Sequence, residues 1–279
     1  MLPNFVVIGA AKSGTTTLWS LLRQHPDIFM SEEKELRYFI ERRNWGKGQA
    51  WYEDQFADVG GARAVGEVSP EYAMAHTYPQ VVPRMAALIP DSKLIYLLRH
   101  PIERMASEWR DYTYAGSETL PIERALRDHP TYIRTSSYAW QLEQFLTAYP
   151  REQILVLLTD DLKADRNKTL RRIFSFLDVD PNWTAQEQSD QNTTVEKRLP
   201  RKHTERLYSS SLRTVARAAI PAPVRRTLNR RLTNSLAELP SSIPADLYDE
   251  IAAQLAPDIA QLGSWLGPDF NGWGIGPAA

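Results

Sequence analysis

The segment Gly9-Ala-Ala-Lys-Ser-Gly-Thr-Thr-Thr17 combines two glycines, one lysine and a run of hydroxyl side chains. It lies between an apolar run and a helical pattern, where backbone N–H groups and the helix dipole form an anion site. In the common phosphate loop, G-x-x-x-x-G-K-[ST], a lysine directly follows the second glycine. Here Thr15 takes that position and the lysine is Lys12. The loop therefore predicts a 5′-phosphate site that is not a triphosphate site, and its expected ligands are Lys12, Ser13, Gly14, Thr15, Thr16 and Thr17.

A second anion site is expected after the apolar run 94–98, where Arg99 follows Leu98 and Ser107 lies eight residues further on. In open α/β sheets, ligands bind at the carboxyl ends of the strands. Arginine offers a permanent, forked charge and serine a single donor, so the two can converge on one phosphate. Arg99 by itself is equally compatible with a surface ion pair. Together with the first loop, it predicts a nucleotide that carries two separate phosphates.

These candidates need an α/β framework, and the hydrophobic pattern predicts one. Apolar runs at 5–8, 64–68, 94–98 and 154–158 are typical of buried strands. Amphipathic patterns predict helices at 15–23, 101–114, 138–149, 166–177 and 244–262. Strands that alternate with helices predict a P-loop-type, three-layer α/β fold, in which helices flank a mainly parallel central sheet.

Composition excludes several classes of protein. The 279 residues include 33 Lys+Arg and 34 Asp+Glu, and 43% are hydrophobic, which argues against global disorder and against a surface that binds nucleic acid throughout. The absence of cysteine excludes disulfides, thiolate metal sites and cysteine nucleophiles. The five histidines lack metal-ligand spacing, so no metal is expected. No apolar run approaches the ~20 residues of a membrane span, and no signal peptide is evident, which predicts a cytoplasmic protein.

Charge is unevenly distributed along the chain. Residues 197–231 hold eleven basic residues and one acid, a local net charge of +10 that leaves −11 for the rest. We expect a single domain over residues 1–279, with a core at about 1–190 and a basic helical region and tail at about 191–279. A solvated helical face is the commoner outcome for such a region. Contact with an anionic acceptor or a membrane surface is the alternative.

The two phosphate motifs carry a resemblance to the sulfotransferases that use 3′-phosphoadenosine 5′-phosphosulfate (PAPS), especially the heparan-sulfate-type branch and its soluble bacterial relatives. Residues 5–17 are similar to that family's 5′-phosphosulfate loop, and residues 97–107 to its 3′-phosphate motif. The segment Lys34-Glu-Leu-Arg-Tyr-Phe39, which follows His25-Pro26, matches the family's catalytic segment. The resemblance covers essentially the whole chain, and the two phosphate motifs in this order are highly specific.

The resemblance implies a role for individual residues. It implies that Arg99 and Ser107 bind the 3′-phosphate, that Glu35 is the catalytic base and that Lys12 stabilises charge on the departing phosphate. Further implied residues are Arg37, Glu67 and Tyr72 on the acceptor side, and Lys197 and Arg198 in a late loop over the nucleotide. Two departures from the family pattern stand out, namely Val68 in place of a lysine and Val195-Glu196 in place of Lys-Gly.

The expected function is in-line transfer of the sulfuryl group of PAPS to an acceptor hydroxyl or amine. The acceptor would be a saccharide, a lipid or a small metabolite, the product 3′-phosphoadenosine 5′-phosphate (PAP), and Glu35 the base. A P-loop kinase or triphosphatase is the first alternative. It is disfavoured because Thr15 replaces the required lysine and Arg99, rather than an aspartate, follows the strand at 94–98. A non-catalytic nucleotide-binding protein is the second alternative.

Overall fold

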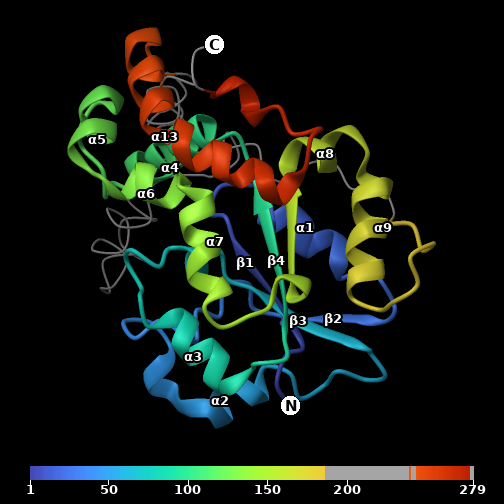
Figure 1. Cartoon of the computed structure of the whole chain (residues 1–279). Helices are drawn as coiled ribbons and strands as arrows, with labels where there is room; N and C mark the ends of the chain where they lie inside the picture. The colour runs from blue at the N-terminus through green and yellow to red at the C-terminus, as the bar shows by residue number, and fades with distance from the viewer. Residues whose placement is uncertain (186–238, 240–242, 277–279) are drawn as a thin grey trace, which may run out of the picture.

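The computed structural model describes residues 1–185, 239 and 243–276. In this part of the chain, five strands form one sheet in the order β2-β3-β1-β4-β5, and every neighbouring pair is parallel (Figure 1). The strands are β1 (Phe5–Gly9), β2 (Ile28–Met30), β3 (Ala64–Val68), β4 (Lys93–Leu98) and β5 (Ile154–Leu158). The central strands β1 and β4 are almost wholly buried, as expected of a parallel sheet that is covered on both faces.

Successive side chains along each strand point to opposite faces of the sheet, so the interior consists of two hydrophobic cores, one on each face. Val6 and Ile8 of β1 face one core, whereas Phe5 and Val7 face the other. One face of the sheet is covered by α1 (Thr15–Leu22), α8 (Thr159–Ala164) and α9 (Arg166–Phe176). The other is covered by α2 (Gly48–Asp54), α3 (Val81–Leu88), α4 (Pro101–Tyr114), α7 (Tyr138–Leu146) and α13 (Ala245–Leu266). Figure 1 shows α7 and α3 on one side of the sheet and α1 and α9 on the other.

Shorter elements complete this framework. The helices α5 (Ile122–Asp128) and α6 (Thr131–Ser136) contact α4. Single 3₁₀ turns occur at η1 (Trp45–Lys47), η2 (Pro70–Ala73), η3 (Arg151–Gln153) and η5 (Gly272–Gly274). The helix α13 contacts α7, and Asp258 joins the two, because its carboxylate accepts hydrogen bonds from the first-turn amides of Ala139 and Trp140 at 3.0 and 2.9 Å. The C-terminal helix is thereby fixed to the core.

The predicted α/β fold is confirmed, with a few differences in detail. All four predicted strands and all five predicted helices occur, and α13 extends to Leu266, beyond the expected end at 262. The three-residue strand β2 was not predicted, nor were α2, α3, α5, α6 and α8. The basic region 197–231 lies outside the described residues, so its helices, its contacts and the single domain over 1–279 stay predictions. Within the described part of the chain, no helix combines the length and apolarity needed to cross a membrane.

Candidate active site

A cavity of about 560 Å³ opens at the carboxyl edge of the sheet. Its walls come from the loop between β1 and α1, the loop after β2, the turn η2, and the helices α4, α8 and α9. The cavity brings together most of the predicted site residues, namely Lys12, Ser13, Gly14, Thr15, Thr16, Thr17, Glu35, Arg37, Arg99 and Ser107. It excludes Glu67 and Tyr72, and Lys197 and Arg198 lie outside the described residues.

The phosphate loop depends on its glycines. Gly14 precedes α1 with φ at 88°, a left-handed conformation that favours glycine. A Cβ atom on Gly9 would lie 2.7 Å from the Tyr96 ring, so only glycine permits this close approach of the β1 backbone to Tyr96. The first N–H groups of α1 have no partner within the helix and line the cavity. The Nζ atom of Lys12 lies 3.2 Å from Asp111 Oδ1 on α4. The loop therefore offers both backbone donors and a cation to an anion.

Arg99 leaves the end of β4 and lies in the cavity with Ser107 of α4. Its Nε and Nη2 atoms donate to Glu103 Oε2 at 3.1 and 2.8 Å. The buried hydroxyl of Tyr138 donates to the carbonyl oxygen of Arg99 at 2.8 Å. Burial raises the pKa of Tyr138 to about 12, so this hydroxyl keeps its proton and acts as a donor at neutral pH. An anion that binds Arg99 and Ser107 would compete with Glu103 for the guanidinium group.

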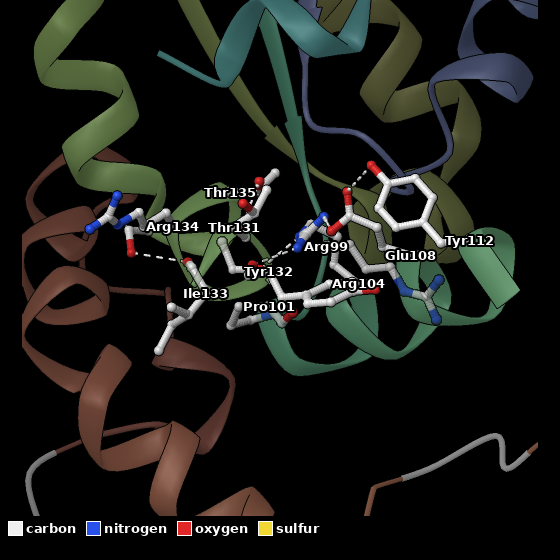
Figure 2. Close-up of polar contacts among 12 residues, drawn as sticks. Arg99, Pro101, Arg104, Glu108, Tyr112, Thr131, Tyr132, Ile133, Arg134 and Thr135 are labelled. Carbon is white, nitrogen blue, oxygen red and sulfur yellow. Dashed lines mark hydrogen bonds and ion pairs between the residues drawn. The ribbon is translucent and has the colours of Figure 1, made fainter. Parts of the chain in front are cut away.

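A buried ion pair holds α4, the helix that carries Ser107, in place. Arg104 is fully buried and donates to Glu108 Oε2 at 2.9 Å, to Ser136 Oγ at 2.7 Å and to the Tyr132 carbonyl oxygen at 2.8 Å. Tyr112 donates to the other carboxylate oxygen of Glu108 at 3.3 Å. Figure 2 shows Glu108 between Arg104 and Tyr112. These bonds join α4 to α6 and thereby fix the helix that carries Ser107.

Glu35 lies in the loop after β2, with its side chain in the cavity and 31% exposed. Its backbone N–H donates to the Val68 carbonyl oxygen at 2.9 Å, which ties the loop to the end of β3. Lys34 Nζ lies 2.5 Å from one carboxylate oxygen, and Arg37 Nη2 donates to the other. Burial by itself would raise the pKa of Glu35, but Lys34 and Arg37 outweigh it, so the pKa lies below its ordinary value. The side chain is therefore a carboxylate at neutral pH.

Arg37 joins Glu35 to a second carboxylate, that of Glu71 in η2. The Arg37 Nε atom lies 2.5 Å from Glu71 Oε2, and Arg43 Nη2 lies 3.5 Å from Glu71 Oε1. Burial raises the pKa of Glu71, against the opposing effect of Arg37 and Arg43. The sequence interpretation included Arg37 and missed Glu71. A signal was present, because Glu71 follows Ser69-Pro70 directly after a buried strand.

Glu67 and Tyr72 were expected to contact the acceptor. In the structure, they lie beneath the wall of the cavity. Both are fully buried. Glu67 Oε1 accepts from Tyr52 and Tyr72 at 2.7 and 2.9 Å, and Oε2 accepts from Ser69 at 2.6 Å. Ser69 Oγ in turn accepts from the Arg37 backbone N–H at 2.9 Å. The expectation of direct acceptor contact is corrected accordingly, because both side chains are fully buried outside the cavity lining and the carboxylate of Glu67 is held by three hydroxyl groups of the core. Ser69 links this carboxylate to the backbone of Arg37.

Two further sequence observations concern the site. Val68 is fully buried in the core that contains α1, and the cations beside Glu35 come from Lys34 and Arg37. Within residues 1–185 and 243–276, no group of three or more histidine or carboxylate side chains is arranged to hold a metal ion. The expectation that no metal is used stays a prediction.

The fold and the site together define an α/β protein in which the glycine-rich loop after β1, Arg99 with Ser107, and the carboxylate of Glu35 share one cavity at the carboxyl edge of a parallel sheet. The family model of the sulfotransferase domain matches residues 2–213, and the chain belongs to the sulfotransferase family. The human heparan sulfate glucosamine 3-O-sulfotransferase 5 is 29% identical over 192 residues, which cover 64% of this chain and 54% of that protein. The membrane-associated sulfotransferase kil1 of Dictyostelium discoideum is 38% identical over 111 residues, which cover 39% of this chain and 22% of that protein.

The likeness to a solved structure extends over nearly the whole chain. A sulfotransferase from Alicyclobacillus acidocaldarius superimposes with a TM-score of 0.69 at 26% identity, covering 98% of this chain and 99% of that one. By contrast, the chain spans about half the length of the heparan sulfate relative and less than a quarter of kil1.

Proposed function

We propose that the protein transfers the sulfuryl group of PAPS to an acceptor hydroxyl or amine, with Glu35 as the general base. One observation carries the proposal, namely that a single cavity contains the phosphate loop, the pair Arg99 and Ser107, and the carboxylate of Glu35. Family membership supports sulfuryl transfer. The similarity to relatives named for heparan sulfate supports a saccharide acceptor.

The nucleotide would extend between the two anion sites. The loop residues Lys12–Thr17 would hold the 5′-phosphosulfate, since they supply backbone donors, hydroxyls and one cation at a helix N-terminus. Arg99 and Ser107 would hold the 3′-phosphate with a forked guanidinium group and a hydroxyl. A nucleotide with two separate phosphates satisfies both sites, whereas a linear triphosphate would leave one of them empty.

The reaction requires a base and stabilisation of the leaving group. The acceptor oxygen forms a bond to sulfur, the bond from sulfur to the phosphate oxygen breaks with its electron pair on that oxygen, and the acceptor proton passes to Glu35. Lys12 and the loop N–H groups would stabilise the negative charge that develops on the departing phosphate, since both belong to residues that line the cavity. Glu35 is ionised at neutral pH and can therefore accept the proton. The two cations that lower its pKa make it a weaker base, because a general base works best when its pKa lies near the operating pH.

The role of Glu35 predicts how the rate depends on pH. As the pH falls through the pKa of Glu35, the base becomes protonated and transfer stops. Replacement of Arg37 by methionine removes one of the two cations that lower this pKa, while the effect of burial remains. We therefore expect the acidic limb of the pH–rate profile of Arg37→Met to move to higher pH. The measurement is the rate of PAP release from PAPS in the presence of a saccharide acceptor and EDTA.

Arg43→Met is the matched control, because Arg43 contacts Glu71, whereas the cations that lower the pKa of Glu35 are Lys34 and Arg37. The acidic limb of the pH–rate profile of Arg43→Met should stay close to that of the unaltered protein. Identical acidic limbs for Arg37→Met and the unaltered protein would exclude Glu35 as the group that titrates.

A further inference from the structure

Two cations in the cavity wall have no part in the reaction described above. The lysines and arginines that line the cavity are Lys12, Lys34, Arg37, Arg99, Lys163 and Arg166. The first four pair with carboxylates of the protein, namely Asp111, Glu35, Glu71 and Glu103. Among the residues that the structure describes, Lys163 and Arg166 have no partner in an ion pair. Both side chains therefore offer their charge to an anion in the cavity.

Lys163 and Arg166 belong to the side of the cavity that contains Arg99. Lys163 is on α8 and Arg166 is the first residue of α9, and both helices follow β5. The strand β5 pairs with β4, and Arg99 directly follows β4. Glu35, by contrast, follows β2 at the opposite edge of the sheet. The strand order thus places the two unpaired cations near Arg99 and away from the carboxylate that would serve the acceptor.

Glu103 links Lys163 to Arg99 electrostatically. The Nη2 atom of Arg99 donates to Glu103 Oε2 at 2.8 Å, so the carboxylate offsets the charge of the guanidinium group. Burial by itself would raise the pKa of Glu103, but Arg99 above all, and also His100 and Lys163, hold that pKa below its ordinary value. Lys163 is therefore close enough to act on the carboxylate that pairs with Arg99.

The charges of these side chains match a phosphate only when Lys163 and Arg166 are included. A phosphate monoester carries a charge of about −1.5 to −2 at pH 7. Arg99 and Glu103 form an ion pair without net charge, and Ser107 adds only a hydroxyl. Lys163 and Arg166 bring the net charge of the four ionised side chains to +2.

On the basis of the proposed function, we propose that Lys163 and Arg166 complete the 3′-phosphate site of Arg99 and Ser107. Arginine binds a phosphate through a planar fork of donors, whereas the ammonium group of lysine acts as a compact charge with three donors. Together these cations compensate for Glu103, which otherwise repels the phosphate. The sequence motif at residues 97–107 gave no sign of either residue, because both follow the next strand of the sheet.

The test compares two nucleotides that differ only in the 3′-phosphate, PAP and adenosine 5′-phosphate. Both are titrated calorimetrically into the full chain in EDTA. Lys163→Met should weaken PAP binding by about three- to tenfold, since an exposed cation is partly screened by solvent and salt. It should leave the affinity for adenosine 5′-phosphate unchanged. Arg166→Met should act in the same direction, and the double variant should lose more PAP affinity than either single variant.

Lys168→Met is the matched control. Lys168 is exposed on α9 outside the cavity, and its backbone N–H, which the substitution retains, donates to Asp165 at the start of the helix. Both affinities should stay unchanged in this variant. A sulfated hexasaccharide, titrated into the chain saturated with PAP, tests an anionic group of the acceptor as the other possible partner of Lys163.

Three results would overturn the inference while the proposed function stands. In each of them the unaltered protein prefers PAP to adenosine 5′-phosphate. Lys163→Met then leaves that preference intact, weakens both nucleotides equally, or weakens only the hexasaccharide. If the unaltered protein itself shows no preference for PAP, the proposed function is wrong and the inference falls with it.

Discussion

Glu35→Gln should reduce the rate of sulfuryl transfer by ~10²–10⁴-fold, the usual contribution of a general base, while PAP binding is retained. Glutamine is close to glutamate in size, and its one carbonyl oxygen can still accept a hydrogen bond from either Lys34 or Arg37, which hold the two carboxylate oxygens of Glu35 at present. Its amide has no carboxylate to take a proton. The measurement compares the initial rate of PAP release from PAPS with the affinity for PAP in the same preparation.

Glu32→Gln is the control, because Glu32 is an exposed glutamate in the same loop and lies outside the cavity. It separates a catalytic role of Glu35 from the general effect of removing one charge from the run at residues 32–35. Equal rates for Glu35→Gln and Glu32→Gln would contradict the assignment of Glu35 as the base. PAP binding without any transfer by the unaltered protein would favour a non-catalytic nucleotide-binding protein.

Arg104→Leu should lower the free energy of unfolding by about 3–5 kcal/mol, the usual cost of removing one partner from a buried ion pair. The substitution leaves the carboxylate of Glu108 without its cation in a position that is almost fully buried. It also removes the hydrogen bonds from Arg104 to Ser136 and Tyr132, which join α4 to α6. Chemical denaturation followed by circular dichroism measures the loss.

Two variants make this test specific. Arg124→Leu breaks an ion pair of the same i,i+4 spacing on α5, but Arg124 is 68% exposed, so a loss of about 1 kcal/mol or less is expected. The double variant Arg104→Leu/Glu108→Leu should recover most of the stability, because no uncompensated charge then remains buried. If Arg104→Leu cost no more than Arg124→Leu, the buried pair would not be what holds α4 in place.

The features that could be predicted from the sequence are those encoded in short, continuous stretches of residues. The strands β1 and β4 are almost uninterrupted apolar runs, and a parallel sheet buried on both faces selects such runs. The phosphate loop is equally local, because its glycines, lysine and hydroxyls all lie within residues 9–17. The strand β2 was missed because Ile28-Phe-Met30 is too short to form a recognisable pattern.

The parts of the site that were missed depend on contacts between distant segments. Glu67 was expected to face the acceptor, but Tyr52, fifteen residues earlier, is one of three hydroxyls that bind its carboxylate within the core. Glu108 shows no local sign of lining a cavity, since an i,i+4 pair with Arg104 is equally common on an exposed helix face. Likewise, Asp258 caps α7 from 119 residues away. Spacing along the chain contains no information about such neighbours.

The central claim is that the cavity binds a nucleotide with a 5′-phosphate and a separate 3′-phosphate, and calorimetric titration tests it most directly. The unaltered protein would be titrated with PAP and with adenosine 5′-phosphate in EDTA, and with ATP in magnesium. Arg99→Ala would be compared with Arg151→Ala, whose guanidinium group stacks on Trp265 outside the cavity.

We expect PAP to bind in EDTA roughly tenfold or more tightly than adenosine 5′-phosphate, because Arg99 makes charge-assisted hydrogen bonds only to the nucleotide that carries a 3′-phosphate. Arg99→Ala should abolish that difference and Arg151→Ala should preserve it. Equal affinity of the unaltered protein for the two nucleotides, or preferential binding of magnesium-ATP, would contradict the proposed PAPS site. Preference for magnesium-ATP would leave a P-loop kinase or triphosphatase as the better interpretation.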